Sequence, residues 1–121
     1  NTHSVSEQQF DEVFDKLIAD KTSFLAYFHG GYTEDGQSWC PDCDVAKPNI
    51  EAIAENFPNI QIYKFPIVDR LEWKKPDYKY RIHPKTNLSR VPTLIYYEKG
   101  IEFGRLIEDQ LFNKDDVLEF V

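Results

Sequence analysis

The chain carries the stretch Trp39-Cys40-Pro41-Asp42-Cys43, and its two cysteines are the only ones among 121 residues. Two thiols at positions i and i+3 form one redox pair if they open a helix, because both sulfurs then lie on one side of the first turn. The same spacing supplies two of the four ligands that a zinc site needs. The surrounding sequence decides between a dithiol and half of a metal site.

A buried strand precedes the motif and a helix follows it. Residues 24–28 form a continuous apolar run, which is typical of a strand buried on both faces. The polar, glycine-containing stretch 29–38 is predicted to be a loop. Pro41 suits the first position of a helix, because the N–H that proline lacks would have no partner there. Pro48 is expected to kink this helix. Its buried stripe is predicted at Ala46, Ile50, Ile53, Ala54 and Phe57.

Helices and strands are predicted to alternate along the rest of the chain. Ser6 and Gln9 form a capping-box pattern before an amphipathic helix, and Asn113 is a predicted cap for a last helix. Residues 60–65 predict a second strand, and residues 93–107 predict an antiparallel hairpin. The alternation predicts an α/β fold with a central mixed sheet, mainly parallel plus the antiparallel hairpin, and helices on both faces.

Length and composition bound the class of protein. Residues 1–121 are expected to form one domain, since 41% apolar and 15% aromatic residues suffice for a core. We also expect the protein to be a monomer. No leader-like segment and no run of about 20 apolar residues is visible, so we expect a cytoplasmic chain without a membrane partner. The net charge of −7 disfavours nucleic acid as a partner.

The charge is unevenly distributed. The segment from Asp69 to Arg90 holds seven Lys/Arg residues against three acids, and its two prolines limit it to short helical pieces. Its aromatic residues, Trp73, Tyr78 and Tyr80, allow two interpretations: stacking platforms for nucleic-acid bases, or anchors packed beneath a solvated face. A basic rim that steers acidic or thiolate substrates is a further hypothesis for this segment.

The residues favour a redox pair over a metal site. A cysteine at a helix N-terminus meets free N–H groups that stabilise a thiolate, so Cys40 is predicted to attack a substrate disulfide and Cys43 to resolve the mixed disulfide. Zinc would need two further ligands, and the three histidines are scattered without ligand spacing. A purely structural disulfide closing four residues would stabilise little. Pro41 and Asp42 weaken the thiolate's support, which predicts a reducing couple.

At this point the sequence resembles the thioredoxin family. Trp-Cys-x-x-Cys after a strand, Pro48 five residues beyond Cys43, and Val91-Pro92-Thr93 before a strand carry the resemblance. It implies a cis-proline at Pro92 that packs near the cysteines, with the Val91 backbone pairing with substrate. Trp39 flanks Cys40, and it either forms a wall that contacts substrate or packs locally on the helix. Ser38 to Cys43, the long preceding loop and Trp73-Lys74 further resemble the 14-kDa thioredoxin-related proteins.

That resemblance implies cytosolic disulfide reduction, with a reversible Cys40–Cys43 disulfide and no bound cofactor. Electrons would come from NADPH through thioredoxin reductase, and the substrates would be small disulfides such as cystine or selected protein disulfides. Peroxidase activity is implied too. Pro41 and Asp42 would tune the redox potential. The alternative is a thioredoxin-fold interaction or redox-sensing protein without efficient turnover.

Two departures from ordinary thioredoxin stand out. Tyr27 falls where thioredoxin has a buried acid, so Asp42 is the nearest hypothetical proton acceptor for Cys43. The loop 29–38 is several residues longer than in thioredoxin. It either crowds the site against large substrates or is a tolerated surface insertion.

Overall fold

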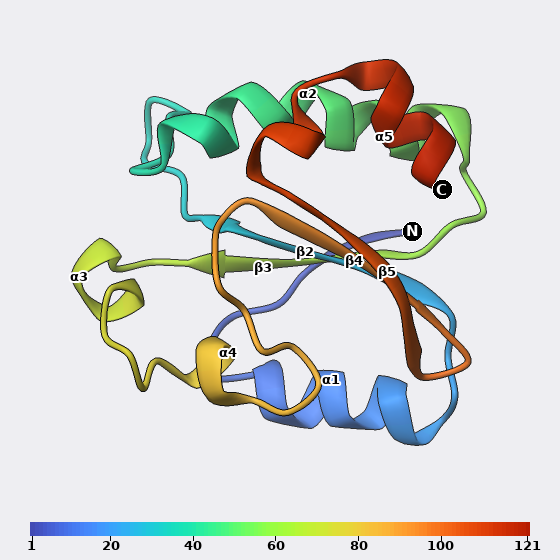
Figure 1. Cartoon of the computed structure of the whole chain (residues 1–121), viewed down its shortest axis with the longest axis horizontal. Coiled ribbons are helices and arrows are strands. Elements are labelled where there is room, and N and C mark those ends of the chain that lie inside the picture. The colour runs from blue at the N-terminus through green and yellow to red at the C-terminus, as the bar shows by residue number, and fades with distance from the viewer.

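The computed structural model describes all of residues 1–121 (Figure 1). One sheet contains the strands β1 (Thr2–Ser4), β2 (Phe24–Gly30), β3 (Ile62–Ile67), β4 (Thr93–Glu98) and β5 (Ile101–Ile107). The helices are α1 (Phe10–Ala19), α2 (Pro41–Asn56), α3 (Arg70–Trp73), α4 (Lys79–Ile82) and α5 (Lys114–Phe120), and a 3-10 turn, η1 (Glu108–Leu111), precedes α5.

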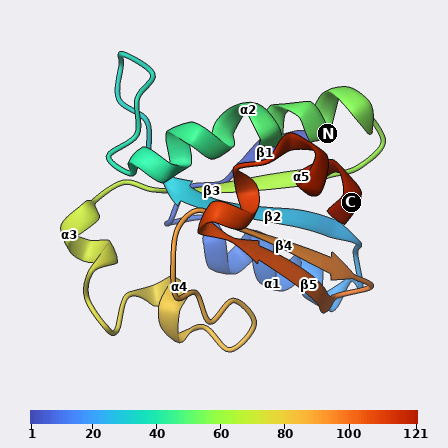
Figure 2. The same cartoon turned by 45° about the horizontal axis from the view of Figure 1, so that its top comes forward.

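The sheet is mixed, which confirms the predicted α/β class. Its strand order is β1-β3-β2-β4-β5. Strands β1, β3 and β2 run parallel to one another, β4 runs antiparallel to β2, and β5 runs antiparallel to β4. Helices α2 and α5 cover one face, and α1 and α4 lie on the other (Figures 1 and 2). The edge strand β1 was not predicted, because three residues are too short to show a periodic pattern.

Strand β2 is the centre of the core, as its apolar run predicts. All seven of its residues are buried, and successive side chains point to opposite faces of the sheet. Phe24, Ala26 and Phe28 belong to the cluster on the α1 side, whereas Leu25 and Tyr27 pack with the buried stripe of α2. The strand runs two residues further than predicted, because His29 and Gly30 pair with Pro66 and Ile67 of β3.

The helix signals were largely right. Pro41 is the first residue of α2, Pro48 lies inside this helix, and Ala46, Ile50 and Ile53 are buried on it. The Asn113 side chain accepts a hydrogen bond from the backbone N–H of Asp116 at 3.0 Å, which caps α5 as predicted. Ser6 and Gln9 exchange hydrogen bonds too, but in the turn just before α1.

The basic segment packs its aromatic rings inward. Trp73 and Tyr78 are 8% exposed and Tyr80 is fully buried, so the hypothesis of a base-stacking platform is wrong and the rings are anchors. The Arg81 guanidinium stacks on Trp73 at 3.7 Å from the ring centroid. None of the helices has both the length and the apolar character that crossing a membrane requires.

Candidate active site

Cys40 and Cys43 lie at the start of α2, after the loop that connects it to β2, and they form a disulfide. Cys40 is the N-cap residue of α2, with extended backbone angles, and Cys43 lies in the first helical turn, so the two Cα atoms are 5.3 Å apart. Cys40 is 6% exposed and Cys43 is not exposed at all. The pair therefore presents one sulfur to the surface and keeps the other behind it.

Backbone N–H groups surround both sulfurs. The N–H of Cys43 points to the Cys40 Sγ at 3.3 Å, and the N–H of Gly30 points to the Cys43 Sγ at 3.4 Å. Such donors stabilise negative charge on sulfur, and the N-terminus of α2 adds the positive end of its dipole. The site is thus built to hold a thiolate when the disulfide is reduced.

Gly30 and Ser38 support the pair, although their role was not predicted. The Ser38 hydroxyl accepts the Cys40 N–H at 3.0 Å and donates to the Gly30 carbonyl at 2.8 Å. A Cβ atom at Gly30 would lie 2.6 Å from Ser38 Oγ, 2.8 Å from Cys40 Cβ and 2.9 Å from an atom of the Trp39 ring. The strand end must therefore be glycine. The sequence signal was present but was interpreted as part of a loop.

The acidic residues of the first turn have different surroundings. An Asp44 carboxylate oxygen accepts the Ser38 N–H at 3.0 Å and so holds the end of the loop against α2. The half-buried Asp42 side chain makes neither a hydrogen bond nor an ion pair. Tyr27 has a buried hydroxyl without a partner, and burial above all, with Tyr32 and Asp44 adding, raises its pKa well above the ordinary value. Tyr27 therefore stays protonated and is no proton acceptor.

The Val91–Pro92 loop, which precedes β4, packs against Cys40. Its peptide bond is cis, and the Val91 carbonyl oxygen lies 3.8 Å from the Cys40 Sγ. Trp39 is half-buried, and its indole N–H donates to the Ile67 carbonyl at 2.7 Å. The structure thus brings Trp39, Cys40 and Val91 together although the last is 51 residues from Cys40.

A groove of about 310 Å³ opens at this point, and we call it the Cys40 groove. It is lined by Trp39, Cys40, Pro41, Arg70, Trp73, Lys74 and Val91. Its two cations, Arg70 and Lys74, come from the basic segment and are exposed. Asp42 and Pro92 do not line it. A disulfide placed in this groove would meet the Cys40 sulfur beside two positive charges.

The long loop lies elsewhere. Residues 31–38 form a hairpin closed by the pairing of Tyr32 with Ser38, and none of them lines the Cys40 groove. Figure 2 shows this loop projecting beyond the start of α2 and away from α3. The wall of the groove on the β3 side is α3, so any restriction of access there comes from α3.

The histidines are not part of the sulfur site. His29 is 3% exposed, and its side chain points to the α2 face, opposite to that of Phe28. His83 packs edge-on against Phe10 and Phe14, 3.4 Å from Asp15. No group of three or more His, Cys, Asp or Glu side chains is arranged to hold a metal ion.

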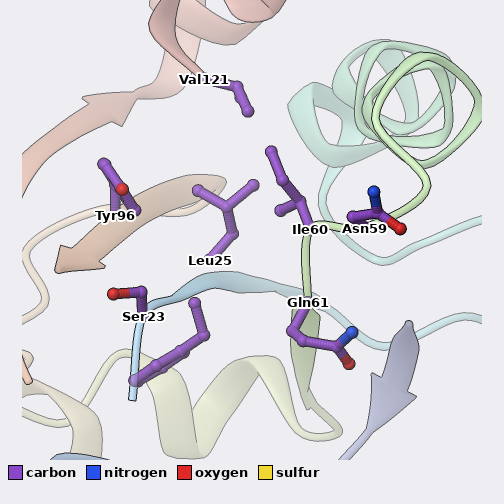
Figure 3. A pocket seen from close by; sticks show the side chains of 8 residues that line it. Ser23, Leu25, Asn59, Ile60, Gln61, Tyr96 and Val121 are labelled. Carbon is purple, nitrogen blue, oxygen red and sulfur yellow. The ribbon is translucent and has the colours of Figure 1, made fainter. Parts of the chain in front are cut away.

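A separate apolar pocket of about 220 Å³ lies at the other end of β2 (Figure 3). Leu25, Ile60, Tyr96 and Val121 face it, and no charged side chain lines it. It contains no cysteine and lies at the end of the strand opposite to the cysteines, so it is not part of the candidate active site.

A dithiol at the N-terminus of a helix that follows a central strand, faced by a cis-proline loop, defines the class: this is a thiol oxidoreductase of the thioredoxin fold. The solved structure of thioredoxin O1 from Arabidopsis thaliana in the oxidized state superimposes with a TM-score of 0.64, covering 99% of this chain and 96% of that one at 20% identity. That likeness shows the fold alone.

Sequence comparison narrows the class to a family. The protein-family model described as "Thioredoxin domain-containing protein 17-like, thioredoxin domain" matches residues 4–121 of this chain. The chain is similar to the thioredoxin-like protein Clot of Oryza sativa subsp. japonica, at 33% identity over 89% of this chain and 86% of the relative. It is also similar to thioredoxin domain-containing protein 17 of Mus musculus, at 36% identity over 77% and 76% of the two chains. The chain belongs to the thioredoxin domain-containing protein 17-like family.

Proposed function

We propose that this protein is a disulfide reductase in which Cys40 is the nucleophile and Cys43 the resolving cysteine. The observation that carries the proposal is the asymmetry of the pair: the Cys40 sulfur borders an open groove, while Cys43 is completely buried behind it. A substrate disulfide that enters the groove can reach the Cys40 sulfur but not the Cys43 sulfur.

The chemistry follows from that asymmetry. The Cys40 thiolate attacks one sulfur of a disulfide R–S–S–R′, the S–S bond breaks, and R′S⁻ leaves and takes up a proton. The Cys43 thiolate then attacks the Cys40 sulfur, forms the disulfide seen in the structure and releases RS⁻. Two electrons pass from the dithiol to the substrate, and the N–H groups of Cys43 and Gly30 stabilise the charged sulfurs.

The partners in this proposal follow from the family. Electrons come from NADPH through thioredoxin reductase, and the substrates are small disulfides such as cystine or selected protein disulfides. The same dithiol reduces a hydroperoxide ROOH when the Cys40 thiolate attacks the terminal oxygen, the O–O bond breaks and the alcohol ROH leaves. Cys43 then attacks the sulfenic acid formed on Cys40, which releases the oxygen as water and leaves the disulfide. We place the protein in the cytoplasm as a monomer. Trp39 and Val91 border the bound substrate, and Pro92, which does not line the groove, positions Val91 through their cis peptide bond. Pro41 and Asp42 tune the potential.

The test is a coupled assay with the whole chain. NADPH consumption is followed with thioredoxin reductase and cystine, and it is expected to rise linearly with the concentration of this protein. A rate equal to that of thioredoxin reductase alone, across cystine and several other disulfides, would remove the proposed activity.

A second candidate function has one observation in its favour. Cys40 is only 6% exposed, which suits a redox sensor or interaction protein that changes state without rapid turnover. In that case the disulfide would be reduced stoichiometrically, but the coupled assay would show a single burst without sustained NADPH consumption.

The role of Asp42 is tested by Asp42→Asn. If its carboxylate takes the proton of Cys43 during resolution, the substitution slows turnover about tenfold or more and changes the pH profile of kcat. Asp44→Asn is the matched control, because that carboxylate is already bonded to the Ser38 N–H. An unchanged rate and pH profile for Asp42→Asn would exclude it as the acceptor.

Electrostatic steering is tested at two adjacent lysines. Lys74 lines the Cys40 groove, whereas Lys75 pairs with Glu72 and does not. Lys74→Glu is expected to lower kcat/KM for a negatively charged disulfide roughly threefold or more at low salt and to flatten its salt dependence. Lys75→Glu makes the same change of charge and should have little effect. Equal effects would show that only net charge matters.

A further inference from the structure

A second hollow lies at the carboxyl ends of the parallel strands, and we call it the strand-end pocket. Its volume is about 590 Å³, and its floor and walls include His29, Tyr32, Trp39, Lys47 and Lys64. Strand register explains the grouping. Tyr27 pairs with Lys64, and His29 pairs with Pro66, so these side chains share the face that carries α2. Trp39 is common to this pocket and the Cys40 groove.

The strand-end pocket is cationic in an acidic protein. Lys47 from α2 and Lys64 from β3 line it, no carboxylate does, and neither lysine forms an ion pair. Both side chains are half-buried. The chain as a whole holds 21 acids against 14 Lys/Arg, so the charge of this pocket is opposite to the net charge of the protein. Half-buried cations without counter-charge in a shared hollow favour an anionic ligand.

Tyr32 and its surroundings form one wall. The Lys47 Nζ lies 4.6 Å from the centroid of the Tyr32 ring. Burial foremost, and then the carboxylates of Asp44 and Glu51, raise the pKa of Tyr32 to about 12, so its hydroxyl keeps its proton. Asp44 is engaged by the Ser38 N–H. These two acids therefore act on this wall from outside the pocket lining.

His29 supplies an acceptor beside the two lysines. Its ring lies between Tyr27 and Tyr32, and its Nδ1 is 2.8 Å from the Gly30 carbonyl, so Nδ1 carries the proton. Burial is the main cause that lowers the pKa of His29 to about 4; the bond to Gly30 opposes it, and Lys64 and Lys47 add to it. The imidazole is thus neutral at physiological pH, and the ring, which lines the pocket, makes its one protein hydrogen bond at Nδ1, so its Nε2 lone pair is free to accept from a ligand.

We infer that the strand-end pocket binds the phosphate group of a small organic phosphate monoester, in the form that still carries a P–OH proton. The ammonium groups of Lys47 and Lys64 meet the charged oxygens, and the P–OH donates to the His29 Nε2. An ionised carboxylate or sulfate offers only acceptors and would set lone pair against lone pair at Nε2. The volume and the aromatic walls leave room for the organic part of the ligand.

The test compares two ligands of equal charge. At about pH 5.5 phenyl phosphate is mainly a monoanion with a P–OH proton, whereas phenyl sulfate is a monoanion without one. His29 remains neutral there. Binding to the full chain is followed by NMR shifts of the Gly31 and Thr33 amides, which belong to the pocket lining. Phenyl phosphate is expected to bind about tenfold more tightly than phenyl sulfate, and inorganic phosphate more weakly than phenyl phosphate.

Two variants assign the effect to named groups. Lys64→Gln should weaken the binding of both ligands about tenfold, while Lys114→Gln, which removes an exposed charge on α5 outside the pocket lining, should leave the binding of both unchanged. His29→Phe keeps an aromatic ring between Tyr27 and Tyr32 and should abolish the preference for phosphate. Equal binding of the two ligands, shifts outside the pocket, or no saturable binding would overturn the inference. Cystine turnover is measured separately, so failure here leaves the proposed reductase activity untouched.

Discussion

Replacing Cys40 by serine is expected to reduce disulfide turnover roughly 10³-fold or more, to the background rate of the coupled assay. A serine hydroxyl stays protonated near neutral pH and cannot form the mixed disulfide. Cys43 cannot substitute for it, because this sulfur has no exposed surface and lies behind Cys40. The measurement is kcat/KM for cystine with NADPH and thioredoxin reductase.

Cys43→Ser is the matched variant, since it removes the other sulfur of the same pair. Cys40 still borders the groove and still attacks, but the mixed disulfide is no longer resolved. Catalytic turnover is lost here as well, while a covalent adduct accumulates that mass spectrometry detects and a reductant releases. Adducts on Cys40→Ser and none on Cys43→Ser would reverse the two assignments.

Gly30→Ala is expected to destabilise the fold by about 2–3 kcal/mol and to lower Tm by about 10 °C. The added methyl would lie 2.6 to 2.9 Å from atoms of Ser38, Cys40 and Trp39, all tied to the cysteine turn. In an unobstructed strand the same substitution stabilises, because glycine is unfavourable there. The sign of the change in unfolding free energy, measured by urea denaturation, therefore reports the crowding directly.

Gly36→Ala provides the comparison for this prediction. Gly36 lies in the loop with φ +82° and no atom within 4 Å of the added Cβ, so its cost of about 1 kcal/mol comes from backbone strain alone. Gly30→Ala should also slow cystine reduction, because the clash displaces the Cys40 backbone, whereas Gly36→Ala should not. If Gly30→Ala is neutral or stabilising, the close approach does not exist.

Local sequence was sufficient for the elements that carry the cysteines. The apolar run of β2, Pro41 at the first helical position and Asn113 as a cap act within one strand or one turn. Their effects depend on neighbours a few residues away, so periodicity and turn chemistry predict them. Asn113 also shows the limit of local prediction. Its hydrogen bond from the Asp116 N–H fixes where α5 begins but does not indicate what α5 packs against.

The residues that support the cysteine pair could not be predicted from local sequence in the same way. Gly30 and Ser38 read as ordinary loop residues, and their role depends on β2 continuing beside β3 to Gly30. The strand-end pocket likewise joins residues from β2, β3 and α2, including Lys47 and Lys64. No periodic pattern links residues that meet only because strands pair in one register.

Short-range patterns are enough to place two cysteines at the start of a helix after a buried strand, since thiol spacing, proline and apolar runs act over a few residues. The folded chain was needed to show which sulfur faces outward, that Val91 lies against Cys40, and that the wall beside them is α3 with Arg70 and Lys74. It also decided that His29 is neutral. Burial and charge at a side chain are sums over neighbours distant in sequence, and those neighbours exist only once the chain has folded.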